Sequence, residues 1–255
     1  MENVPSITIA KIEYGRRPAA TALNPKMDPE SPVLLATLAI GWDEPDPREA
    51  LARIEKTLLA FSPSFGRHEC RGPMAYHVFA SGNGSPRRGD ASPNAGAPGA
   101  PGREPAAAPP LEGSLALAHL IEHAVIDFQC AILHNGRCSG VTGALREPPG
   151  WFDLMVECRE FSVGRLCLNL AIAWVKAATL GRRLGAAEGD LLMAARSARA
   201  GASDSVTPSL VARGLGWSDS RAEQALKRLR EAGYLDETPC TLNFSGIPAY
   251  RICTA

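Results

Sequence analysis

The 255-residue chain has no surplus of charge of either sign. Lys plus Arg and Asp plus Glu both number 27, so the formal net charge is zero. Proteins whose main task is binding nucleic acid or an acidic membrane surface usually carry a strong positive charge over the whole domain. The balance excludes this general character and leaves only a local basic face to consider.

The chain also lacks paired cysteines, a secretory signal and a membrane-length apolar run. Its seven cysteines include no Cys-x-x-Cys spacing, and their odd number argues against a disulfide framework. No basic segment followed by an apolar run stands near the N-terminus. The run Leu166–Leu180 is interrupted by Asn169 and Lys176 and falls short of the roughly 20 residues that span a bilayer. We therefore expect a cytoplasmic protein.

Large apolar side chains are missing from residues 81–110, where Gly, Pro, Ala and Ser dominate. Such a segment cannot bury enough surface to offset the entropy of ordering it, so we predict a disordered insertion. It either joins two domains or interrupts one. Residues 1–80 and 111–186 are predicted to form an α/β-type unit, and residues 187–255 a separate small domain.

The predicted elements of the first unit alternate between strand and helix, which is typical of an α/β or α+β fold. Before the insertion, the patterns predict strands at 6–14, 32–42 and 74–80 and a helix at 46–61. After it, they predict a helix at 114–133, a turn-rich stretch, a strand at 151–161 and a helix at 163–185 that Gly185 closes.

The C-terminal residues contain a different set of helix-start and helix-stop signals. Thr207 is placed as an N-cap before Pro208, and Gly214 as a helix stop. Ser218 is placed as the N-cap of a second helix that Gly233 closes. Two short strands follow, and this layout resembles a winged helix-turn-helix domain. The resemblance implies DNA binding or protein binding, and the candidate phosphate contacts are Arg221, Lys227, Arg228 and Arg230.

The helix after the insertion contains His119-Leu-Ile-Glu122-His123. At roughly 100° per residue, the three polar side chains lie opposite an apolar stripe centred on Leu117. Histidines at positions i and i+4 can bind one zinc ion, and the glutamate beside them can accept a proton from water. This is the His-x-x-Glu-His order of some zinc peptidases. The same pattern also fits an ordinary amphipathic helix, and five residues alone do not decide between the two.

A third ligand would strengthen the metal hypothesis. Asp153, Met155 and Glu157 share one face of the predicted strand, because alternate side chains of a strand point the same way. Glu157 is the best candidate, with Cys158 and Glu160 as weaker ones. Alone, Glu157 would be interpreted as an edge-strand residue that faces water.

Several segments together resemble the N-terminal domain of cyanophycin synthetases: the first strand, Pro63–Gly72, the His-x-x-Glu-His helix, the Gly-rich turn, and Val156-Glu157 followed by Val163-Gly164-Arg165. In some members that domain is a zinc-dependent peptidase that cuts the polymer into primers. By position, the resemblance implies His119, His123 and Glu157 as zinc ligands and Glu122 as the general base. Arg137 and Arg146 in the turn are candidates to bind a substrate carboxylate; the alternative is that they are ordinary solvated loop side chains.

Two departures limit the resemblance. The chain lacks the length of the family's ATP-grasp and ligase domains and any G-x-x-x-x-G-K-[ST] loop, so we expect no synthetase activity.

The first functional hypothesis is a zinc peptidase or amidohydrolase acting on an Asp/Arg-type polymer or another isopeptide. The second is a regulator, in which a peptidase-like sensor or scaffold is joined to a module that binds DNA or protein.

Overall fold

The structure is a computed structural model that describes residues 4–43, 47–61, 110–134, 138–201, 205–238 and 248–253. The predicted insertion at 81–110, the segment Pro63–Gly72 and the strand expected at 74–80 lie outside the described residues. The described residues form a mixed helix-and-sheet fold, which confirms the α+β class.

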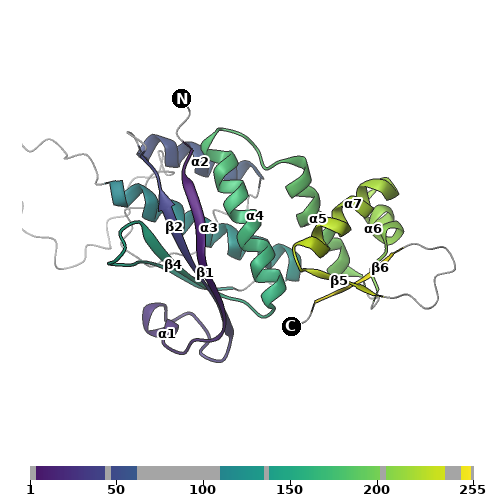
Figure 1. Cartoon of the computed structure of the whole chain (residues 1–255), viewed down its shortest axis with the longest axis horizontal. Helices are drawn as coiled ribbons and strands as arrows, with labels where there is room; N and C mark the ends of the chain where they lie inside the picture. The colour runs from purple at the N-terminus through teal and green to yellow at the C-terminus, as the bar shows by residue number, and fades with distance from the viewer. Residues whose placement is uncertain are drawn as a thin grey trace, which may run out of the picture.

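A four-stranded antiparallel sheet forms the centre of the N-terminal part (Figure 1). Its strands lie in the order β1 (Ser6–Arg16), β2 (Pro32–Gly41), β4 (Trp151–Glu157) and β3 (Gly140–Ala144). The register places Leu34 opposite Val156 and Ala36 opposite Leu154. These apolar residues share one face of the sheet, because alternate residues of a strand point the same way.

That face carries the main hydrophobic core. Helices α2 (Pro47–Phe61), α3 (Pro110–Leu133) and α4 (Phe161–Thr179) supply the apolar side chains that meet it. Phe128 of α3 stacks on Trp174 of α4 with 5.0 Å between ring centroids. The other face of the sheet is covered by the connection between β1 and β2, where Ala20 of the short helix α1 (Ala20–Leu23) and Met27 pack with Val33 and Met155.

Two helices of the described chain are long and apolar enough to cross a membrane by length and composition alone. They are the Gly113–Leu133 part of α3 and the whole of α4. The fold buries 61% of the apolar window of α3 and 67% of that of α4. Central helices of a packed core show this composition, so the observation carries little weight toward a membrane protein.

The C-terminal elements gather at one end of the molecule (Figure 1). They are α5 (Ala186–Ala200), α6 (Pro208–Leu215), α7 (Asp219–Glu231), β5 (Leu235–Thr238) and β6 (Ala249–Ile252). The two strands form an antiparallel ribbon, and Val206 adds a single bridge to Tyr250. The hydrophobic core runs without a break from the sheet through α3 and α4 into these helices.

Polar contacts join the start of α4 to the C-terminal elements. Arg199 of α5 forms a two-pronged ion pair with Glu160, and Ser162 donates to the carbonyl oxygen of Cys253 at 2.8 Å. Arg165 donates through Nη2 to the carbonyl oxygen of Ala232 at 2.6 Å. These contacts hold the C-terminal elements against α4.

The predicted N-caps are confirmed. The side chain of Thr207 accepts a hydrogen bond from the amide of Leu210 at 3.4 Å, and that of Ser218 from the amide of Arg221 at 3.3 Å. Gly233 follows α7 with a φ of 71°, as a helix-closing glycine should.

Other predicted boundaries are wrong. The helix placed at 163–185 begins at Phe161 and ends at Thr179, and Gly181, with a φ of 63°, follows its end. Gly185 instead precedes α5. Gly214 lies inside α6, and the left-handed residue at its end is Gly216. The strand expected at 151–161 ends at Glu157, and β3 formed within the stretch predicted to consist of turns.

Candidate metal centre

The His-x-x-Glu-His residues lie midway along α3, on the face opposite the predicted apolar stripe. Leu117 and Ile121 of that stripe are fully buried. The opposite face of α3 is buried as well, since Glu122 is 3% exposed and His123 is 5% exposed. His119 is the most accessible of the three, with 22% of its side chain exposed. The polar residues therefore do not form an ordinary solvated helix face.

The two imidazoles point their Nε2 atoms at one another, at a distance of 2.9 Å. Their rings stand nearly perpendicular, at 81°. The Nδ1 atom of His119 lies 3.2 Å from Oε2 of Glu122. If Nδ1 carries the proton and donates to this carboxylate, the lone pair on Nε2 of His119 accepts a hydrogen bond from Nε2 of His123. A carboxylate behind a ligating histidine is the usual support for a metal-binding tautomer.

Glu122 is held between α3 and the edge strand β3. The hydroxyl of Thr142 donates a hydrogen bond to Oε2, the same oxygen that faces His119. Oε1 lies against Gly140, where a Cβ atom would be 2.7 Å from it. Glycine at position 140 thus gives the buried carboxylate the space it occupies. A carboxylate this buried needs such donors, because an unpaired buried charge is strongly unfavourable.

The pair of Nε2 atoms fits half of a zinc site. Two nitrogens bound to one tetrahedral zinc at about 2.05 Å would lie about 3.3 Å apart, so a small outward rotation of either ring suffices. A catalytic zinc usually has three protein ligands. No group of three His, Cys, Asp or Glu side chains within the described ranges is arranged to hold a metal ion.

Glu157 is not the third ligand in this structure. Its carboxylate accepts hydrogen bonds from the amides of Asp28 at 2.6 Å and Ser139 at 2.8 Å. It lies on the sheet face of Met155, whereas Glu122 contacts Thr142, which is opposite Leu154 on the helix-covered face. Alternation along β4 therefore points Glu157 away from α3, and its carboxylate joins the β1–β2 connection to the start of β3.

The weaker candidates for the third ligand are also engaged elsewhere. Glu160 pairs with Arg199. Cys158 is buried and donates to the carbonyl oxygen of Glu160 at 3.0 Å. Burial raises the pKa of its thiol to about 11, so it stays protonated at neutral pH and is a poor ligand.

The chain matches no protein-family model, no curated protein and no solved structure. The resemblance to the N-terminal domain of cyanophycin synthetases therefore stays a prediction.

The two arginines predicted to bind substrate are not brought to the histidine pair. Arg137 lies outside the described residues. Arg146 is exposed in the turn between β3 and β4, and no hydrogen bond or ion pair within the described ranges joins it to α3.

Three of the four predicted phosphate contacts are ion-paired within the C-terminal part. Arg221 binds Asp190 of α5 through Nε at 2.9 Å and Nη2 at 2.6 Å and stacks over Trp217. The hydrogen bond to Asp190 raises the pKa of the Arg221 guanidinium. The other two pairs are Arg228–Glu188 and Arg230–Glu237. Lys227 alone has no acidic partner in the described part of the chain.

Sequence reasoning missed Thr142 and Gly140, the residues of β3 that position Glu122. The available signal was the β-branched pair Val141-Thr142 between two glycines, which fits a short strand. The surrounding glycines and prolines were interpreted as turn residues, so the strand was not predicted.

Proposed function

We propose that the chain is a zinc-dependent peptidase or amidohydrolase centred on His119, Glu122 and His123. One observation carries the proposal: two histidine Nε2 atoms converge at 2.9 Å while a buried carboxylate lies against the first ring. Without a metal the same 2.9 Å contact is a hydrogen bond between the two imidazoles, and a metal ion would replace its proton. A zinc ion, when bound, would polarise an amide carbonyl and make a water molecule more acidic.

The protein residues in this proposal have distinct tasks. His119 and His123 supply nitrogen ligands, and Thr142 with Gly140 fixes the carboxylate of Glu122 beside them. Glu122 accepts the proton of the attacking water and passes it to the leaving amine. Oε2 accepts from Thr142 and faces Nδ1 of His119, so in this role the proton would go to Oε1.

The edge position of β3 favours an extended polyamide substrate. Hydrogen bonds from Glu157 N to Ser139 O and from Leu145 N to Trp151 O, both 2.8 Å, show that alternate residues from 139 to 145 face β4. The amide and carbonyl of Thr142 therefore point outward, and no described strand pairs with that edge. A peptide that adds there as a fifth strand would lie beside Glu122. An Asp/Arg-type polymer or another isopeptide is the proposed substrate class, on the strength of the family resemblance.

Metal content of the purified protein tests the centre. We expect about one zinc per chain in the wild type, and loss of most of it in His119→Ala, because one of only two described nitrogen ligands is removed. Glu157→Gln is the matched variant: since its carboxylate faces away from α3, it should keep its zinc. Elemental analysis after dialysis against zinc-containing buffer makes the measurement.

Two results would count against this assignment. Absence of zinc from the wild type after zinc is supplied would remove the metal centre. Loss of zinc in Glu157→Gln, with folding intact by circular dichroism, would restore Glu157 as a ligand and contradict the strand orientation described above.

A second candidate function concerns the C-terminal elements. We propose a winged-helix fold for residues 186–253. The order of elements fits: helix α5, the bridging residue Val206, helices α6 and α7, and the ribbon of β5 and β6. The ion pairs of Arg221, Arg228 and Arg230 neutralise the helix that would face DNA. This favours contact with a protein partner over DNA binding.

Salt dependence distinguishes the two uses of the module. Four free phosphate contacts would give a slope of log Kd against log salt of about 3.6, whereas Lys227 alone would give about 0.9. We expect a slope near the lower value, or no measurable binding, in a fluorescence-anisotropy titration with random duplex DNA. A slope of three or more would favour the DNA-binding regulator.

A further inference from the structure

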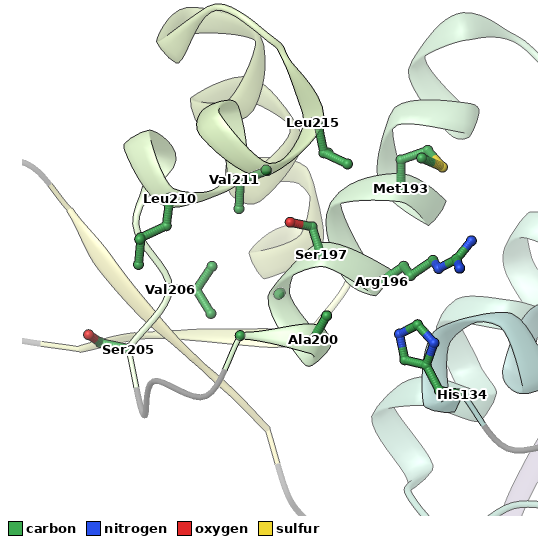
Figure 2. A pocket seen from close by; sticks show the side chains of 13 residues that line it. His134, Met193, Arg196, Ser197, Ala200, Ser205, Val206, Leu210, Val211 and Leu215 are labelled. Carbon is green, nitrogen blue, oxygen red and sulfur yellow. The ribbon is translucent and has the colours of Figure 1, made fainter.

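A groove with a volume of about 850 Å³ lies between the end of α3 and helices α5 and α6 (Figure 2). Its walls are mainly apolar, and Val206, Val211 and Leu215 contribute to them. Met193 and Leu210 also line it, at 42% and 46% exposure; they are two of the five exposed large hydrophobic residues in the described part of the chain. The volume falls within the range that holds a small organic ligand.

The groove contains a cationic side chain, that of Arg196. Arg196 of α5 and His134, the residue after α3, lie on the same side of it (Figure 2). Among the residues that the structure describes, none of the thirteen that line the groove is Asp or Glu. Arg196 has no acidic partner among the described residues, unlike Arg199 one turn further along α5, which pairs with Glu160. The side chain of Ser197 adds a hydroxyl near the middle of the groove.

We propose that this groove binds a small amphipathic anion, with its carboxylate or phosphate at Arg196 and His134 and its apolar body against Met193 and Leu210. A guanidinium matches the geometry of both anionic groups. An apolar body would cover the exposed side chains of Met193 and Leu210, which otherwise remain in contact with water. No acidic residue among those lining the groove opposes the negative charge.

The groove is separate from the metal centre. Along α3, His134 stands eleven residues after His123, which corresponds to about 16 Å at 1.5 Å per residue. The inference therefore does not depend on zinc, and its test can fail or succeed independently of the proposed peptidase activity. A ligand there would contact α3 and the C-terminal helices together.

Isothermal titration with octanoate, octyl phosphate and octanol, each below its micellar concentration, tests the proposal. We expect saturable binding of about one octanoate or octyl phosphate per chain and much weaker binding of octanol. Octyl phosphate binding more tightly than octanoate would identify phosphate as the preferred head group, and the reverse order a carboxylate. The same titrations on His119→Ala should be unchanged, because that histidine lies outside the groove.

Matched variants measure separately how the charge of Arg196 and the apolar wall contribute to ligand binding. Arg196→Gln should weaken octanoate binding about tenfold, while Arg213→Gln, on α6 but outside the lining, should not. Leu210→Gln should weaken both anions and octanol, whereas Leu23→Gln, at a similarly exposed leucine of α1, should leave them unchanged. Absence of saturable binding in the wild type, or equal binding of octanol and octanoate with no effect of Arg196→Gln, would overturn the proposal.

Discussion

Replacement of Glu122 with Gln is expected to abolish turnover of an Asp/Arg polymer while zinc remains bound. Gln keeps the size of the side chain and its contact with Thr142, but it cannot accept a proton from water. General-base catalysis contributes about 10²- to 10⁴-fold, and a loss in that range is expected in kcat. The measurement is the initial rate of release of new amino termini by zinc-loaded protein, with the zinc content determined on the same sample.

Thr142→Val is the control for an effect of position alone. It removes the hydroxyl that orients Glu122 but leaves the carboxylate in place, so its loss of kcat should be smaller, about tenfold. A Glu122→Gln variant that retains wild-type turnover with one zinc bound would show that Glu122 only supports His119. A variant that loses zinc together with activity would show the same carboxylate to be required for the metal site itself.

Helical periodicity was sufficient to predict how α3 divides its faces. The stripe centred on Leu117 is buried, and His119, Glu122 and His123 lie together on the other side. Periodicity does not reveal what covers that second face. The partner is β3, which comes from a Gly-rich stretch in which the short β-branched pair Val141-Thr142 is a weak strand signal, and which pairs with β4 through backbone hydrogen bonds.

The position of Glu157 shows a similar limit. Alternation correctly placed it on the same face as Asp153 and Met155, and the alternating burial of β4 agrees. Alternation does not say which of the two faces meets α3. That choice is made by the uninterrupted apolar set Phe152, Leu154 and Val156, which enters the main core and leaves Glu157 on the opposite face with Asp153.

The sequence shows which residues of the C-terminal part are charged, but it does not show which of them form ion pairs with one another. Asp190 precedes Arg221 by 31 residues and Glu188 precedes Arg228 by 40 residues. These pairs meet only because α5 packs against α7. These basic residues therefore form ion pairs within the C-terminal part.

Helix ends that depend on a side-chain cap were predicted well. Glycine alone did not identify the end of α4 or α6, since only Gly181 and Gly216 adopt the left-handed conformation there.

Gly233→Ala is expected to destabilise the fold by about 2–4 kcal/mol, more than an ordinary substitution at a helix end. Two costs add. Gly233 has a φ of 71°, where an alanine is strained by about 1 kcal/mol. A Cβ atom there would also overlap the guanidinium of Arg165, which donates to the carbonyl oxygen of Ala232 at 2.6 Å, a charge-assisted bond worth about 1.5–3 kcal/mol.

Gly216→Ala isolates the backbone cost. Gly216 has nearly the same conformation, with a φ of 67°, but nothing lies within 4 Å of the Cβ position, so only the strain of about 1 kcal/mol is expected. Urea unfolding of both variants gives the difference. In an Arg165→Met background, Gly233→Ala should cost no more than Gly216→Ala, because the blocked contact is already gone. Equal costs for the two glycines in the wild-type background would mean that Arg165 does not hold α7 against α4, and that other contacts, such as Glu160 with Arg199, maintain this junction.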